Sequence, residues 1–152
     1  MDLAGDGRTI LAHAELGGRQ TSLPEDFRIA TEEELQAVAR CSGISIASHT
    51  WTHSNLRALS PSEVQTELET SMTWLQSRFR SFTPWLSYPY GLYSTDVARA
   101  AQRAGYAGAV RVEGGWLRTG SHVETHAIPR VNVPASISLD GFRMRLGGIA
   151  AK

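Results

Sequence analysis

The sequence has 152 residues, of which 41% are hydrophobic and 20% charged, a composition typical of one globular domain with a core. Its 15 basic and 15 acidic residues cancel and no stretch concentrates Lys or Arg, which argues against a nucleic-acid-binding protein or a polybasic membrane contact. Cys41 is the only cysteine, so an intrachain disulfide is excluded. The chain shows no signal-peptide pattern and no run long enough to span a membrane, so we expect a cytoplasmic protein by default.

Residues 1–30 form a poorly defined N-terminal segment, and residues 31–152 are predicted to form one domain. Residues 10–16 could make one short helix, which Gly17 and Gly18 would end. His13 and Glu15 in this stretch are either metal ligands or solvated polar residues on a surface helix. Both interpretations stay open.

The first clear helix is predicted to begin after Thr31, because Thr31 and Glu34 have the capping-box spacing. It should run to about Cys41, with Gly43 as its terminator. The alternating residues that follow, 44–47, predict a short strand. A stronger helix start is Ser60-Pro61-Ser62-Glu63, with a capping hydroxyl, a proline at the first helical position and a glutamate. The apolar stripe of that helix is Val64, Leu68, Met72, Leu75 and Phe79.

The rest of the chain continues to alternate predicted strands with predicted helices. A strand is broken sharply by Pro89-Tyr90-Gly91, and a helix capped by Ser94 or Thr95 ends at Gly105. Strands alternating with helices favour βαβ units and a parallel sheet. The predicted elements of this half are strand 85–88, a helix, strand 106–112, a loop over 113–125, strand 128–133 with Pro129 at an edge or irregular start, and a short helix after Ser138.

Two histidines, His49 and His53, directly follow predicted strand 44–47. A single helical turn would bring residues at this spacing to one side, so that both imidazoles could bind one cation. The neighbouring hydroxyls could orient the rings by bonding the nitrogens that do not face the metal; they are Ser48, Thr50, Thr52 and Ser54. The end of a strand is also where α/β proteins place their chemistry. The sequence therefore predicts half of a metal site.

The histidine stretch and the turn after the next strand together resemble the polysaccharide deacetylases of the NodB-homology group, carbohydrate esterase family 4. The matching segments are Ser48–Leu56 followed by Leu59-Ser60, Ser87–Gly91, Gly105-Tyr106 and Ile128–Val131. The resemblance covers about residues 31–145. It implies an α/β fold, a partial, distorted (β/α) barrel with parallel strands. The family's first strand, which ends in Thr-Phe-Asp-Asp and supplies the catalytic base and third metal ligand, has no counterpart here.

Carried over residue by residue, the resemblance makes His49 and His53 ligands of a divalent metal, with Zn²⁺ favoured. The backbone N–H of Tyr90 would stabilise the oxyanion. Pro89 and Gly91 would shape the turn that binds the substrate.

Other site residues are less closely tied to the motifs. His126 is the expected late catalytic histidine, with His122 as the alternative, unless both are solvated loop residues. Trp51 and Trp116 are candidates for stacking on sugar rings, or lids over the core.

The resemblance implies a metal-dependent hydrolase that removes acetyl groups from N- or O-acetylated carbohydrates, with small acetyl esters as further substrates and its base unidentified. The alternatives are a non-catalytic carbohydrate-binding remnant and a structural metal-binding protein. We also expect a homo-oligomer, because a sheet without its first strand has an unpaired edge.

Overall fold

The computed structural model describes residues 30–112, 115–117, 123–134 and 136–148. Contacts divide the chain into two compact units, Met1–Ile44 and Ser45–Lys152. Among the described residues, none of the helices has both the length and the apolar character that a membrane span requires.

The first unit contains helix α2 (Glu32–Ala39), which begins at the N-cap Thr31. The predicted capping box is present: the Thr31 hydroxyl accepts from the Glu34 N–H at 3.3 Å, and the Glu34 carboxylate accepts from the Thr31 N–H at 2.8 Å. The predicted helix over residues 10–16, with His13 and Glu15, lies outside the described residues.

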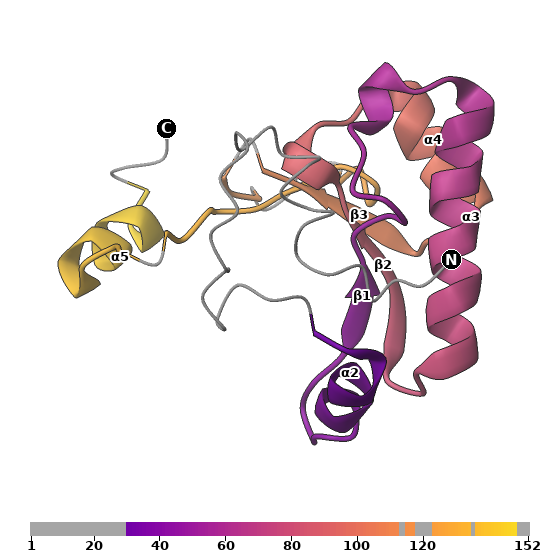
Figure 1. Ribbon diagram of the computed structural model, residues 1–152. Coiled ribbons are helices and arrows are strands. Elements are labelled where there is room, and N and C mark those ends of the chain that lie inside the picture. Colours follow the sequence, from indigo (N-terminus) through magenta and orange to yellow (C-terminus); the bar gives the residue numbers. More distant parts are fainter. Residues whose placement is uncertain (1–29, 113–114, 118–122, 135, 149–152) are drawn as a thin grey trace, which may run out of the picture. The chain divides into compact units, whose positions relative to one another are not determined.

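The second unit is built on a parallel sheet with the strand order β1-β2-β3-β4 (Figure 1). Helices α3 and α4 pack against one face of this sheet. The parallel α/β architecture expected from the sequence is confirmed. The elements are β1 (Ile46–Ser48), the 3-10 helix η2 (Leu56–Ala58), α3 (Pro61–Arg78), β2 (Phe82–Ser87), the 3-10 helix η3 (Pro89–Gly91), α4 (Thr95–Arg103), β3 (Gly108–Arg111), β4 (Ile128–Pro129) and α5 (Leu139–Leu146).

Strand β2 starts earlier than predicted because it carries a bulge. Ile46 of β1 pairs with Phe82, but Ser48 pairs with Leu86, so β2 holds extra residues around Pro84. Proline has no N–H to donate to a neighbouring strand, and bulges are where sheets accommodate it. Its carbonyl still accepts from the Ala107 N–H at 2.7 Å.

The other strands are displaced or shorter than predicted. Strand β1 covers 46–48 instead of 44–47, β3 covers 108–111 instead of 106–112, and β4 keeps only two residues of 128–133. As expected for a strand containing proline, β4 lies at an end of the described sheet.

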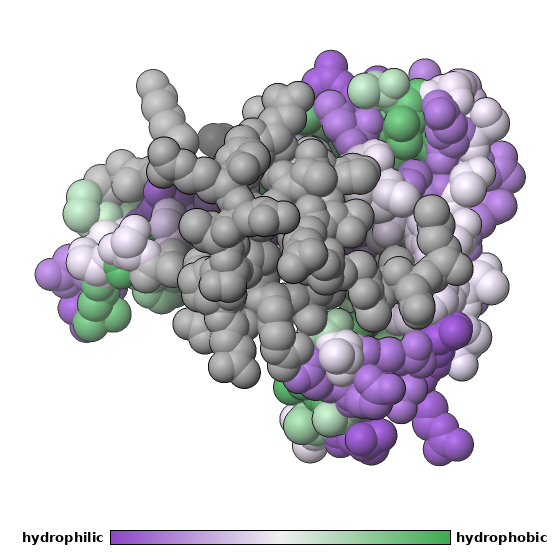
Figure 2. Space-filling view, in the orientation of Figure 1, coloured by the Kyte–Doolittle hydropathy of each residue, from purple (hydrophilic) through white to green (hydrophobic). Residues whose placement is uncertain are grey.

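Helix α3 supplies much of the core. Its start has both bonds of the Ser60–Glu63 capping box and a proline at the first turn, as predicted. Every residue of the predicted apolar stripe is buried, with Leu68 fully inaccessible at 0%. The opposite face is polar, and Figure 2 shows purple and white residues along the outer side of this helix. Three residues of the stripe, Val64, Leu68 and Met72, form one core cluster with Leu86, Tyr88, Ala101, Tyr106 and Ala109 of the neighbouring elements.

We expect the isolated chain to self-associate through β1. This strand is an end of the described sheet, and a strand edge without a partner offers unpaired N–H and C=O groups. Light scattering across a concentration series should show dimers. Ala47→Pro should shift the equilibrium toward monomers, because the Ile46 N–H bonds toward β2 and the next N–H points away from it. A monomer at every concentration would contradict this expectation.

Candidate active site

The two histidines lie on a loop and not on the helical turn expected from their spacing. Thr50 and His53 have φ of 69° and 61°, in the left-handed region that residues with a Cβ rarely adopt. Nevertheless the ring centroids of His49 and His53 lie 4.7 Å apart with an interplanar angle of 73°. The two imidazoles lie together as predicted, but a loop with two left-handed residues brings them together and not a helical turn.

His49 is oriented by a backbone carbonyl. Its Nδ1 lies 2.7 Å from the carbonyl oxygen of Ser87, the last residue of β2. A carbonyl oxygen only accepts, so Nδ1 carries a proton, and in the neutral ring Nε2 presents its lone pair. This is the bond by which proteins fix the tautomer of a metal-binding histidine.

The hydroxyl groups of Ser48, Thr52 and Ser54 bond to the loop and the core, whereas we predicted that they would orient the rings. The buried Thr50 hydroxyl has no hydrogen-bond partner among the described residues. The Ser48 hydroxyl accepts from the Thr50 N–H at 3.1 Å and lies 2.7 Å from the Ser71 hydroxyl. The Thr52 hydroxyl lies 2.8 Å from the Ser54 hydroxyl. The ring partner that the structure shows is the Ser87 carbonyl, which the sequence pattern did not indicate.

His53 lies between His49 and Tyr90. Its ring centroid is 4.9 Å from that of Tyr90, at an interplanar angle of 70°. Desolvation by burial, and secondly the nearby His49, lower the pKa of the His53 imidazole below its usual value. The neutral ring, which is the form that binds metals, therefore persists to lower pH.

The turn after β2 brings Tyr90 to the histidine loop. Tyr90 has a φ of 58° inside η3, and the residue is 63% exposed. The hydrogen bonds of the turn run from the Gly91 N–H to the Tyr88 carbonyl (2.9 Å) and from the Leu92 N–H to the Pro89 carbonyl (3.1 Å). Neither bond uses the Tyr90 N–H, the group predicted to donate to an oxyanion.

Pro89 and Gly91 are both buried, so they form the inner side of the turn. Gly91 has a φ of 68°, and a Cβ built there would lie 2.4 Å from the Val112 Cβ. Both residues thus help to place Tyr90, and their part in substrate binding stays a prediction.

A buried polar cluster lies beneath the histidine loop. The Tyr106 hydroxyl is 3.0 Å from the Ser48 hydroxyl and 3.1 Å from the Leu68 carbonyl, and Ser71 completes the cluster. Burial raises the pKa of the Tyr106 phenol, so it stays protonated and donates. The cluster ties the end of β1 to α3, and no sequence motif indicated it.

His126 lies just before β4 with both ring nitrogens hydrogen-bonded. Its Nε2 is 2.8 Å from the Tyr106 carbonyl and its Nδ1 is 3.2 Å from the Thr125 hydroxyl. Its own carbonyl accepts from the Tyr88 hydroxyl at 2.8 Å. These bonds connect β4 to the core, and a catalytic role for His126 stays a prediction. The alternative, His122, lies outside the described residues.

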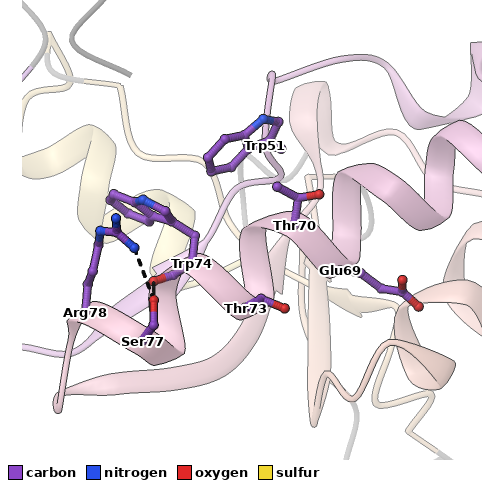
Figure 3. A pocket seen from close by; sticks show the side chains of 7 residues that line it. All are labelled: Trp51, Glu69, Thr70, Thr73, Trp74, Ser77 and Arg78. Atoms are coloured by element: carbon purple, nitrogen blue, oxygen red, sulfur yellow. Dashed lines mark hydrogen bonds between the residues drawn. The ribbon is translucent and has the colours of Figure 1, made fainter. Parts of the chain in front are cut away.

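Trp51 lines a shallow groove of about 440 Å³ on α3 (Figure 3). Its ring centroid lies 6.2 Å from that of Trp74, and the Arg78 guanidinium lies 4.9 Å from the Trp74 centroid. Trp116 is 44% exposed. Sugar stacking by Trp51 and Trp116 stays a prediction.

The described residues offer two side chains, His49 and His53, that could serve as ligands of a catalytic zinc site. Such a site normally has three protein ligands and one open position. No group of three His, Cys, Asp or Glu side chains within the described part of the chain could hold a metal ion. His49 and His53 fit a divalent metal as a partial ligand set.

Comparisons with known proteins identify the family. Residues 20–109 match the polysaccharide deacetylase family, and the chain belongs to it. Over 112 residues the chain is 34% identical to YxkH of Bacillus subtilis (strain 168), whose name assigns it to the same family. The alignment covers 74% of this chain but only 39% of YxkH, so the chain spans well under half of that relative.

Solved structures of deacetylases share the fold. The deacetylase PplD of Streptococcus pyogenes, solved with acetate, aligns with a TM-score of 0.67 at 20% identity over 78% of this chain and 51% of PplD. The polysaccharide deacetylase BC0361 of Bacillus cereus aligns with a TM-score of 0.68 at 16% identity over 95% of this chain and 49% of BC0361. The fold predicted from the motifs, a partial barrel of the NodB-homology type, is confirmed.

Proposed function

We propose that this chain belongs to a metal-dependent hydrolase that removes acetyl groups from N- or O-acetylated carbohydrates. The observation that carries the proposal is the convergence of His49, His53 and the Tyr90 turn at the ends of β1 and β2. The two imidazole centroids are 4.7 Å apart and the Tyr90 ring centroid lies 4.9 Å from that of His53. Membership of the polysaccharide deacetylase family supports the substrate class.

Each residue has a definite part in this proposal. His49, with Nδ1 bonded to the Ser87 carbonyl, offers Nε2 to a divalent metal, and His53 offers its neutral ring. Zn²⁺ is favoured because it binds imidazole nitrogen well. When bound, the metal polarises the acetyl carbonyl and lowers the pKa of a water molecule. The Tyr90 N–H donates to the oxygen on which negative charge develops.

The third metal ligand and the catalytic base lie outside this set. No carboxylate in the described part of the chain completes a metal-binding group with the two histidines. We propose that carboxylates from elsewhere in the protein, or from a second subunit, supply these two groups. If a second subunit supplies them, it could bind through β1, the strand at which we expect self-association.

A second candidate function is a carbohydrate-binding remnant that has lost its base. The partial ligand set favours it, as does the groove in which Trp51 and Trp74 offer indole surface. The two functions differ in whether the protein hydrolyses any acetyl substrate when metal is present.

The test is an assay of a chromogenic acetate ester beside an N-acetylglucosamine oligomer. Where no carboxylate supplies the base, its loss typically costs about two to four orders of magnitude in rate, and amide hydrolysis should then be weak. Hydrolysis of the chromogenic ester should be less affected, because its leaving group needs little protonation. We expect His53→Ala or a chelator to reduce ester hydrolysis to background, and added Zn²⁺ to restore only the chelated wild type. Ester hydrolysis unchanged by both treatments would exclude the metal mechanism.

A further inference from the structure

The loop that carries the histidines is held by a carboxylate on α3. Glu67 is only 8% exposed. One of its oxygens accepts from the N–H groups of Trp51 at 3.0 Å and Thr52 at 2.8 Å. The other accepts from the Thr52 hydroxyl at 2.6 Å. All three donors belong to the residues between His49 and His53.

We propose that Glu67 is a positioning residue, which forces the loop into the conformation that brings the two histidine rings together. The consequence for metal binding rests on the proposed function. The claim about the loop conformation does not, because it concerns only the bonds between Glu67 and the backbone.

The geometry of the bonds explains the backbone of the loop. Two successive N–H groups point at a single carboxylate oxygen, which is the arrangement of an anion-binding nest. Nests need residues in the left-handed region, and here Thr50 and His53 flank the two donors with φ of 69° and 61°. In this protein the anion in the nest is the protein's own side chain.

The bonds to Glu67 can offset the strain of the loop. A non-glycine residue in the left-handed region is destabilising, and the loop has two such residues. A hydrogen bond to a charged group is stronger than one between neutral groups, and Glu67 accepts three of them. The described residues give Glu67 no ion-pair partner, so the loop donors stabilise its buried charge. The bonds can therefore hold both strained residues in place.

The same bonds separate Glu67 from the groups that the site still needs. Both of its oxygens are directed at the loop backbone and the Thr52 hydroxyl. A carboxylate used in this way is not available as the third metal ligand or as the catalytic base. Its part is to hold the ligands and not to touch the metal or the substrate.

The first test is amide hydrogen exchange in the full chain, measured by NMR for Trp51 and Thr52. We expect exchange at both amides to be at least about tenfold faster in Glu67→Ala than in the wild type, as expected on losing a bond of roughly 1.5 kcal/mol. Glu67→Gln keeps one acceptor oxygen and should be intermediate. Glu69→Gln, an equal charge change on an exposed residue of the same helix, should change nothing. Amides of the α3 core serve as the check of folding, and Glu67→Gln carries the test if the alanine variant does not fold. Equal exchange at Trp51 and Thr52 in the wild type and the variant would overturn the proposal.

The second test is titration with Zn²⁺ of the same proteins. Removing a group that orients metal ligands typically costs 10- to 100-fold in affinity, and we expect a loss at the lower end for Glu67→Ala and none for Glu69→Gln. If exchange quickens but affinity is unchanged, Glu67 only stabilises the loop and the positioning role is wrong. A wild type that binds no Zn²⁺ contradicts the proposed function, while the exchange result still decides whether Glu67 sets the loop.

Discussion

Replacing His49 with alanine is expected to reduce divalent-metal binding by at least about 100-fold, since a partial site that loses one of two imidazoles keeps a single ligand. His53→Ala should have the same effect. The measurement is the metal content of protein purified without chelator, followed by Zn²⁺ titration. Because two histidines are an incomplete set, the wild-type affinity should itself be lower than that of a three-ligand site.

The matched control is His126→Ala. The ring nitrogens of His126 are bonded to the Tyr106 carbonyl and the Thr125 hydroxyl, so its removal should leave the metal content unchanged. Equal metal content in the wild type and in His49→Ala would remove the two-histidine site from consideration. A loss in all three histidine variants would instead indicate general destabilisation.

The parts of the fold that were predictable are set by interactions close in sequence. The capping boxes at Thr31 and Ser60 involve residues three apart, so the helix starts were found where the structure has them. The apolar stripe of α3 repeats at helical period for the same reason. The parallel sheet followed from the order of the elements.

The strand limits were less predictable because they depend on partners distant in the chain. The bulge at Pro84 is defined by which residues of β1 and β3 lie opposite it. The sequence shows the proline, but it does not show where the neighbouring strands place their donors. For this reason β2 was predicted to begin only after Pro84.

The histidine pair was found from its spacing, whereas its conformation was not. A spacing of four suits a helical turn, but the loop follows the bonds to Glu67 and to the Ser48 hydroxyl instead. One signal was present in the sequence. Glu67 and Ser71 lie on the same helical face as Val64, Leu68 and Met72, and polar residues on a buried face need partners. The apolar pattern of α3 alone does not reveal them.

Gly91→Ala is expected to lower the free energy of unfolding by about 2–4 kcal/mol, from the backbone cost of the left-handed region and the cost of overpacking. The turn has a φ of 68° at Gly91, and the new Cβ would lie 2.4 Å from the Val112 Cβ and 2.6 Å from the Val112 nitrogen. Because backbone atoms cannot rotate away as a side chain can, the turn itself must move. The Tyr90 N–H would move with it, so ester hydrolysis should fall even in the fraction that remains folded.

Gly105→Ala separates the backbone cost from the overpacking cost in the expected loss of unfolding free energy. Gly105 has a φ of 91°, but a Cβ there meets nothing within 4 Å. Its replacement should therefore cost only the backbone term, about 1–2 kcal/mol. Urea denaturation followed by tryptophan fluorescence gives both values. The excess for Gly91→Ala measures the contact with Val112, and equal losses in the two variants would show that this contact does not fix the turn that presents Tyr90.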